Sequence, residues 1–283
     1  MMRRTASRRA IAFLLQAGCA AAVAQVPRVP FAGVQGATAG AGSLTGWERH
    51  GGENPAALGP PGYAASLAGY SPFGLEGLRV TELAAARDAG RWGGSLEWRG
   101  LSYGGEAGGP GSSRWTVQAA WKPRSRWNLG AAMRYRIPDE EPGPGAGMGF
   151  LWRPHPALSL GGAWEGAWDR RGWEGRAGWG VDAGTSFGGG YAWRFCAEHF
   201  AEHFPRGARD GTLRSEWRLG AGFRLHPLLS VHAGVAPGER TAALGLRFGM
   251  GAWEGYSALR RHAALGGTSI QGLTFRRERR DGK

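Results

Sequence analysis

The stretch RWTVQAAWKPRSRWNLGAAMRYRI, Arg114–Ile137, alternates between two kinds of side chain with a period of two. One set is polar or small, and the other is apolar: Trp115, Val117, Ala119, Trp121, Trp127, Leu129, Ala131, Met133, Tyr135 and Ile137. Successive side chains of a β-strand point to opposite faces, so this alternation predicts two strands. The break at Lys122–Ser125, which contains a proline, predicts the turn that joins them.

The length of these strands and the chemistry of their faces narrow the fold class. Each strand, and a third at Arg214–Leu225, runs for roughly ten to twelve residues, against about five or six in soluble proteins. A tilted strand that crosses a bilayer needs about nine to eleven residues. The polar face is rich in Arg and Gly, which suits a barrel lumen. The pattern therefore predicts an antiparallel transmembrane β-barrel, with a soluble two-sheet β protein as the alternative.

Composition excludes several other classes. The chain holds 52 Gly and 14 Trp, and neither residue favours a helical core. Gly shows no period of three, which excludes collagen, and the many aromatic residues argue against disorder. No window after the N-terminal leader holds eighteen apolar residues in a row, so membrane-spanning helices are not expected. Only Cys196 remains beyond the leader, so no intramolecular disulfide is expected.

The N-terminus has the features of an export signal. A basic segment, MMRRTASRR, precedes a short apolar run, and Ala22–Ala24 supplies the small-x-small pattern of a cleavage site. We therefore expect residues 1–24 to be a signal peptide. A lipoprotein signal ending at Cys19 is a weaker alternative, because Gln16 stands where that motif needs an aliphatic residue. A twin-arginine signal is weaker still.

Turn signals divide the rest of the chain at regular intervals. Short turns alternate with longer connections, one of them expected at Ala197–Thr212. We expect a plug segment at 25–60 and a barrel at 61–283 with about fourteen strands. An even number of strands places both ends of the barrel on the periplasmic side.

The alternation also assigns side chains to the lumen and to the membrane interfaces. Charged residues on the polar faces are expected to line the lumen, with acids paired to bases: Arg99, Arg134, Glu165, Arg176, Asp182, Glu216 and Arg218. Tryptophans near the strand ends are expected at the membrane interfaces, where an indole can bury its ring and keep its N–H wet: Trp92, Trp115, Trp127, Trp152, Trp168 and Trp173.

Both ends of the chain resemble one family. The segment GVQGATAGAGSLTGWERHGGENPAALG, which contains Asn54, Pro55, Ala56, Ala57 and Leu58, is similar to the N-terminal region of the FadL/PorV/PorQ-like outer-membrane barrels. The last hairpin, YSALRRHAALGGTSIQGLTFR, resembles the closing strands of the PorV-like branch through Tyr256, His262, Leu265, Gly266, Gly272, Leu273 and Phe275.

The resemblance implies a fourteen-stranded barrel in the bacterial outer membrane with an N-terminal plug. It assigns the plug motif to Asn54, Pro55, Ala56 and Leu58, and we expect Asn54 and Leu58 to lie inside the barrel. The chain departs from the usual assembly signal at Arg277, where a second aromatic residue would follow Phe275.

Enzyme signatures are few. His199, Glu202 and His203 form an H-x-x-E-H string, which binds zinc when it lies on a helix. We expect this string in a loop, where it reads as a tandem copy of AEHF, and we predict neither a metal site nor a cofactor. Ser215 and Ser230 with His232 are available for a Ser–His pair, but we predict no catalytic residues.

The resemblance implies two functions. The first is a FadL-like passive channel for small hydrophobic or amphipathic molecules, and the alternative is a PorV/PorQ-like non-catalytic scaffold for protein secretion or surface attachment. The expected partners are outer-membrane lipid and lipopolysaccharide, with a hydrophobic solute or a secreted protein according to the function. The Arg excess behind the net charge of +13 is assigned to lumen and loops and not to nucleic acid.

Overall fold

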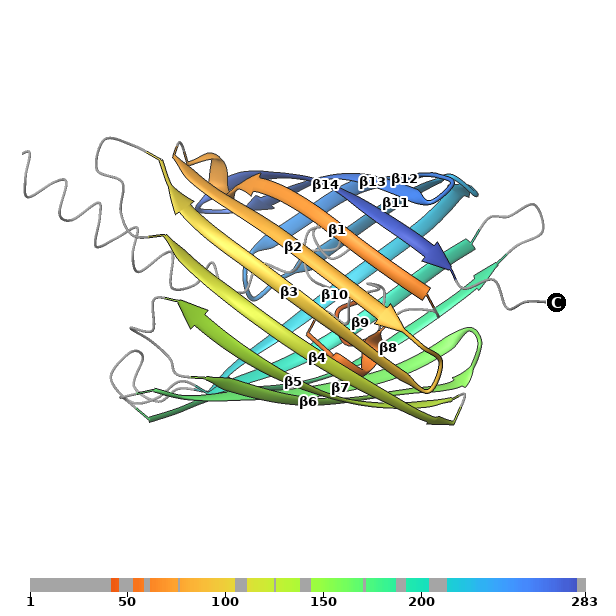
Figure 1. The fold of residues 1–283 in the computed structure, drawn as a ribbon. Coiled ribbons are helices and arrows are strands. Elements are labelled where there is room, and N and C mark those ends of the chain that lie inside the picture. The colour runs from red at the N-terminus through yellow and green to blue at the C-terminus, as the bar shows by residue number, and fades with distance from the viewer. Residues whose placement is uncertain are drawn as a thin grey trace, which may run out of the picture.

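The computed structural model shows a single closed barrel in which all neighbouring strands are antiparallel (Figure 1). It describes residues 42–45, 53–58, 62–75, 77–104, 111–124, 126–137, 144–169, 172–186, 192–203 and 213–278. The strands are β1 (Gly62–Ser71), β2 (Leu78–Asp88), β3 (Trp92–Tyr103), β4 (Ser112–Arg124), β5 (Trp127–Ile137), β6 (Gly145–His155), β7 (Leu158–Asp169), β8 (Gly172–Ser186), β9 (Ala192–His203), β10 (Leu213–His226), β11 (Leu229–Ala236), β12 (Thr241–Met250), β13 (Trp253–His262) and β14 (Gly266–Glu278). The predicted fold class and strand number are confirmed. The expected signal peptide at 1–24 lies outside the described residues.

Closure depends on the pairing of the first and last strands. β1 and β14 pair without a register shift from Gly62 opposite Glu278 to Ser71 opposite Ser269. Each strand therefore has a partner on both edges. In hydrocarbon an unpaired backbone N–H or C=O costs several kcal/mol, so closure is what allows strands to cross a bilayer. No helix among the described residues is long and apolar enough to cross a membrane.

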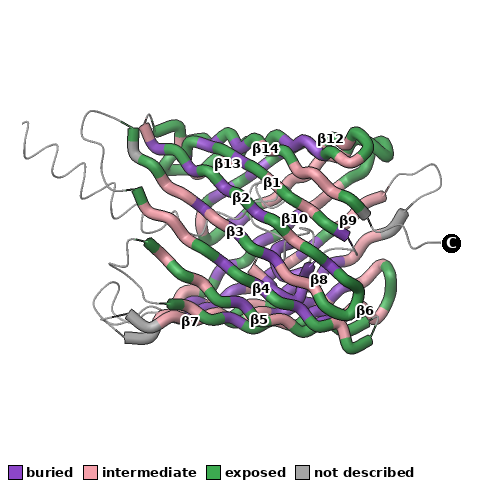
Figure 2. Tube along the Cα trace, in the orientation of Figure 1, coloured by how far each residue is buried: buried purple, intermediate pink, exposed green. Residues whose placement is uncertain are grey.

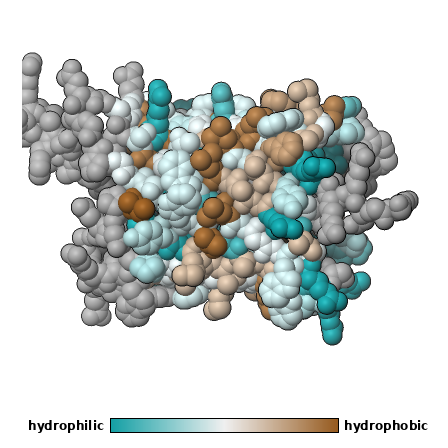
Figure 3. All heavy atoms as spheres, in the orientation of Figure 1, coloured by the Kyte–Doolittle hydropathy of each residue, from teal (hydrophilic) through white to brown (hydrophobic). Residues whose placement is uncertain are grey.

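The two faces of the wall differ as the alternation predicts. On β5, Met133 is 69% exposed and faces outward, whereas its neighbour Ala132 is 4% exposed and faces the lumen. The same alternation of buried and exposed residues follows the strands around the barrel (Figure 2). Apolar side chains gather between the two rims of the face shown in Figure 3. Such an outer surface has the chemistry of a lipid-facing wall and excludes the soluble alternative.

Connection lengths distinguish the two rims. At the rim where β1 begins and β14 ends, several hairpins turn within two or three residues, as at 89–91 and 251–252. The opposite rim carries longer connections, including those at 104–111 and 138–144. Short periplasmic turns and longer extracellular loops are usual in outer-membrane barrels, so the rim where β1 begins and β14 ends is periplasmic.

One turn folds inward at the extracellular rim. The short 3-10 helix η3 (Pro72–Gly74) connects β1 to β2, and Phe73 within it has a positive φ of 57°. The backbone N–H of Phe73 donates to Thr268 Oγ1 at 2.8 Å, on the luminal face of β14. This bond holds the turn against the inner wall and places Phe73 above a cluster of apolar luminal side chains.

Candidate functional site

Two stretches of the N-terminal region lie inside the barrel. Gly42–Thr45 and Glu53–Leu58, which we call the plug, approach the luminal faces of β3 and β5–β10. Asn54 and Leu44 have no exposed surface, and Leu58 is 2% exposed. Leu58 Cδ1 lies against Gly93 near the periplasmic end of β3. The plug therefore occupies the lumen, and its described part ends close to the periplasmic rim.

Asn54 connects the plug to itself and to the wall. Its Nδ2 donates to the backbone carbonyl of Leu44 and to that of Phe150 on β6, each at 2.8 Å. Its Oδ1 accepts from the backbone N–H of Ala56 at 3.0 Å and caps η2 (Pro55–Ala57). Pro55 fits the first position of this 3-10 helix because its ring fixes φ and no N–H is needed there. One side chain thus joins both plug stretches to the barrel.

Glycines on the wall make room for the plug. A Cβ added at Gly149 on β6 would overlap Asn54 Oδ1, and one at Gly161 on β7 would overlap the carbonyl oxygen of Leu44. On β5, a Cβ at Gly130 would overlap the backbone of Pro55 and Ala56. These three glycines, which we call the glycine cradle, let the plug backbone touch the strands directly. Beside them, Asn128 Nδ2 donates to the carbonyl of Ala56 at 3.1 Å.

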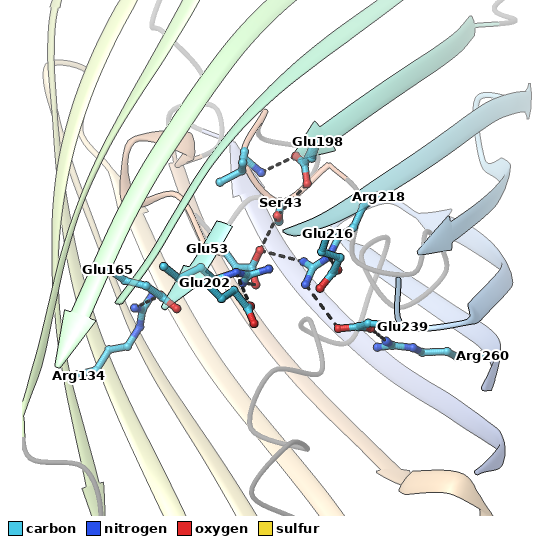
Figure 4. A network of polar contacts seen from close by, with 12 residues as sticks. Ser43, Glu53, Arg134, Glu165, Glu198, Glu202, Glu216, Arg218, Glu239 and Arg260 are labelled. Atoms are coloured by element: carbon cyan, nitrogen blue, oxygen red, sulfur yellow. Dashed lines mark hydrogen bonds and ion pairs between the residues drawn. The ribbon is translucent and has the colours of Figure 1, made fainter. Parts of the chain in front are cut away.

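Charged groups hold the other side of the plug. Glu53 forms ion pairs with Arg176 on β8 and with Arg218 on β10, the latter at 3.0 Å, and accepts from Ser43 Oγ at 2.8 Å. Burial alone would raise the pKa of Glu53, but the two arginines and the Ser43 hydroxyl together hold it well below its usual range. Glu53 is therefore a carboxylate that faces two cations (Figure 4).

A second carboxyl group binds the plug backbone. Glu198 on β9 accepts from the N–H of Leu44 at 2.7 Å and from Ser43 Oγ at 3.0 Å. The guanidinium groups of Arg176 and Arg218 lie over the Phe200 ring, with Cζ 3.7 and 4.5 Å from its centroid. This stacking fixes both guanidiniums where they meet Glu53.

The ion pairs continue across the lumen toward β13. Arg176 Nε lies 3.0 Å from Glu202, and Arg218 pairs with Glu216 on its own strand. Glu239 bridges Arg218, at 3.9 Å, and Arg260, at 2.6 Å (Figure 4). Arg218 is 1% exposed, so this network is desolvated and its members depend on one another.

The structure places the charged residues predicted for the lumen on the luminal face. Arg134 pairs with Glu165 as expected, and Arg99 lies 2.7 Å from Glu82 as well as 4.0 Å from Glu97. Asp182 pairs with Arg194. Arg176, which the sequence left to pair with an acid of the wall, contacts Glu53 of the plug and Glu202.

The tryptophans predicted for the interfaces lie near both rims. Trp92 and Trp127 face outward at the periplasmic rim and stack on Trp121 and Trp152, with ring centroids 6.0 and 5.3 Å apart. Trp115 faces outward toward the extracellular half of β4. The backbones of Trp168 and Trp173 face each other at the extracellular end of the β7–β8 hairpin, but their side chains lie outside the described part of the chain.

The expected loop at Ala197–Thr212 is wrong over its first half. Residues 197–203 belong to β9 and pair with both β8 and β10. Strand alternation turns His199 and His203 outward and Glu202 into the lumen, so H-x-x-E-H cannot place its three side chains around one ion. The tandem AEHF copy has a period of four, which keeps the alternation and therefore extends the strand.

Two Ser–His pairs form, on opposite sides of the wall. His199 Nε2 lies 2.7 Å from Ser215 Oγ on the outer surface. Ser230 Oγ lies 2.9 Å from His232 Nε2 in the lumen.

Several site residues were not predicted from the sequence. Glu53, Ser43 and Glu198 hold the plug, and the glycine cradle receives it. Strand parity alone would have placed Glu198 in the lumen, because it shares a face with Glu202. No sequence pattern indicates that Glu198 contacts Ser43, because the two residues lie more than a hundred positions apart.

Comparison with known proteins identifies the fold. No family model matches the chain, and no curated protein is similar to it in sequence. Among solved structures, the CymD monoaromatic hydrocarbon channel is 12% identical with a TM-score of 0.56, and the alignment covers 88% of this chain and 98% of that one. The Ralstonia pickettii toluene transporter TbuX is 13% identical with a TM-score of 0.56, covering 88% and 97%. A Pseudomonas aeruginosa FadL homologue is 12% identical with a TM-score of 0.53, covering 87% and 97%.

Proposed function

We propose that this chain, whose fold is that of the FadL-like barrels of the bacterial outer membrane, is a plugged passive channel for small hydrophobic or amphipathic molecules. Three of the solved structures with this fold are a monoaromatic hydrocarbon channel and two toluene transporters. The function proposed for this chain is inferred from the side chains of its own lumen.

The observation that carries the proposal is an apolar cluster on the luminal wall near the extracellular rim. It is formed by side chains of β1, β2, β13 and β14 with Phe73 and Leu101 packed against it: Ala68, Tyr70, Val80, Tyr256, Ala258 and Ile270. A channel for ions or sugars needs a polar wall there. These side chains pack against one another with 8% or less of each exposed, so a hydrophobic solute reaches them only when this packing opens, and burial there then contributes about 25 cal/mol per Å².

A small cavity next to this cluster adds polar groups. It measures about 40 Å³ and is lined by Val80 and Leu101 of the cluster region together with Arg99, Arg114, Arg136, Ser112 and Ser113. A cavity of this volume admits only a small group, and its guanidinium groups beside apolar carbon suit the anionic end of an amphipathic molecule whose hydrophobic body lies outside it. The amphipathic part of the proposal rests on this cavity.

The plug sets the condition for passage. It fills the lumen beside β3 and β5–β10, on the periplasmic side of the cluster, and we propose that a solute crosses when the plug moves. Its contacts through Asn54, Glu53 and Ser43 can each be removed by a single substitution. We infer a channel that is closed at rest.

Uptake into liposomes tests this function. Full-length protein and a variant lacking residues 37–58 are reconstituted and supplied with a fluorescent long-chain fatty acid and, separately, with a charged hydrophilic dye. We expect faster uptake of the fatty acid by the deletion variant, with little entry of the dye. Equal entry of both probes would indicate a general pore, and no uptake of fatty acid by either protein would refute the channel.

A PorV/PorQ-like scaffold is the second candidate. The desolvated network around Arg218 favours it, because a lumen filled by ion pairs is suited to staying closed. If the chain is such a scaffold, neither the full-length protein nor the variant lacking residues 37–58 transports the fatty acid. The full-length chain instead co-purifies with a defined secreted protein of its own host.

A further inference from the structure

The outer wall carries a groove at the periplasmic end of β1, β2 and β3. Its volume is about 630 Å³, and its lining is largely apolar. Three small outward-facing residues form its floor: Ala65 and Ala85 are directly paired, and Gly94 is paired with Arg87, two residues along β2. The larger outward-facing side chains that line it are Tyr63, Trp92, Leu96 and Phe275. The lipid-facing wall is thus hollowed by small residues at one defined place.

Two arginines stand at the periplasmic edge of this groove. Tyr63 is paired directly with Arg87 on β2 and with Arg277 on β14, so all three side chains are on the outer face of adjacent strands. Side chains of directly paired residues lie about 5 Å apart at Cβ. The Arg87 guanidinium lies over the Tyr63 ring, 5.2 Å from its centroid. Both arginines are exposed.

The charge at this edge has one sign. On β2 and β3, Glu82, Asp88 and Glu97 are buried on the luminal face. Asp88, next to Arg87, points inward and pairs with Lys122. Two guanidinium groups therefore face the membrane at the level of the periplasmic headgroups with no outward-facing carboxylate described beside them.

We propose that this groove is a binding site for one anionic phospholipid of the periplasmic leaflet. The phosphodiester lies between the guanidinium groups of Arg87 and Arg277, and one acyl chain lies over Ala65, Ala85 and Gly94. Guanidinium groups match phosphate oxygens in charge and geometry. Basic residues at a membrane surface attract anionic lipid, and here an apolar groove adds a place for the chain.

The site does not depend on transport. It lies on the outside of the wall, and its two arginines and its floor are distinct from the plug and from the side chains that hold the plug, so it can be tested whatever the lumen does. Its position beside the β1–β14 seam, where Ala65 pairs with Phe275, gives the lipid a role in holding the closing strands together.

The proposal is tested by native mass spectrometry, which measures the lipid retained on the full-length barrel. The protein is released from detergent to which phosphatidylglycerol or phosphatidylethanolamine has been added. We expect one phosphatidylglycerol to be retained and phosphatidylethanolamine to be lost more readily. Arg87→Gln should weaken retention about tenfold, because a charge-assisted pair to phosphate is removed. Arg79→Gln is the matched control, since Arg79 faces outward at the extracellular end of the same strand.

Two further variants divide the site into headgroup and chain. Arg277→Gln tests the headgroup contact from the other strand and serves if Arg87→Gln fails to fold. Ala85→Leu fills the floor and should abolish retention, whereas Ala131→Leu, an outward-facing alanine on β5, should not. Equal losses in Arg79→Gln and Arg87→Gln, full retention by Ala85→Leu, or displacement of the lipid by an equal concentration of inorganic phosphate would each overturn the proposal.

Discussion

Asn54 of the plug donates a hydrogen bond from Nδ2 to the backbone carbonyl of Phe150 in β6, at 2.8 Å. The same nitrogen donates to Leu44. The contact is possible because Gly149, the neighbour of Phe150, has no side chain in the way. A polar side chain with no exposed surface thus has its amide group satisfied by the plug and by the wall.

Asn54→Ala should loosen the plug. Two buried carbonyl groups lose their donor and η2 loses its cap, which costs about 1–3 kcal/mol for each unsatisfied buried group. Hydrogen exchange of the plug backbone in the reconstituted barrel should rise, while exchange in β1 and β14 stays unchanged. Gln271→Ala, on the outer face of β14, is the control. Unchanged plug exchange would show that Asn54 does not hold the plug.

Gly149→Ala should displace the plug by steric overlap. A Cβ at this position meets Asn54 Oδ1, and the wall on either side is too well paired to retreat. We expect susceptibility of the plug to an added protease to rise several-fold. Gly249→Ala provides the comparison, because that luminal glycine on β12 has its nearest neighbour atoms 3.9 Å from an added Cβ. If both variants resist protease like the parent chain, the glycine cradle is not required.

Glu53→Gln should weaken the plug through charge. Removing the carboxylate leaves Arg176 and Arg218 with less compensation in a desolvated site, and breaking such a buried pair costs about 3–5 kcal/mol. Glu53→Asp, which keeps the charge, should lose less. Hydrogen exchange of Ser43 and Leu44 reports the effect.

The pH dependence of the effect of Glu53→Gln on plug exchange follows from the lowered pKa of Glu53. A carboxyl group whose pKa falls on folding contributes stability that is fully present above its ordinary pKa of about 4.3. The contribution declines only as the pH falls below that value toward the lowered pKa. The difference in plug exchange between the parent chain and Glu53→Gln should therefore stay constant from neutral pH to about pH 5. A difference that disappears near neutral pH would contradict the ion pairs.

Met133→Arg should destabilise the barrel in the membrane. Met133 faces outward near the middle of β5, and a cation at the bilayer midplane costs about 2–4 kcal/mol, against about 0–1 near an interface. Ile137→Arg, at the extracellular end of the same strand, should be nearly neutral. Denaturant titration of protein folded into vesicles measures both. Equal effects would mean that β5 does not cross the bilayer as its exposure pattern indicates.

The sequence alone predicted the antiparallel barrel, about fourteen strands, the class of side chain on each face of the strands quoted, and the resemblance of the Asn54–Leu58 motif to a plug. These features are local, because a period of two and a strand length are determined within ten consecutive residues. The loop expected over His199–His203 is instead the end of β9, because strand alternation continues through the AEHF repeat.

Only the tertiary structure decided which residues meet. Glu53 lies against Arg176 and Arg218, and Asn54 reaches Gly149 and Phe150, because closure of the barrel brings the luminal faces of β6, β8 and β10 around a segment that precedes all of them. The lipid groove likewise depends on β14 returning to β1, which sets Arg277 beside Tyr63 and Arg87. Alternation determines which face of the wall each side chain occupies. Strand register and barrel closure determine its neighbours, and both are properties of the whole chain.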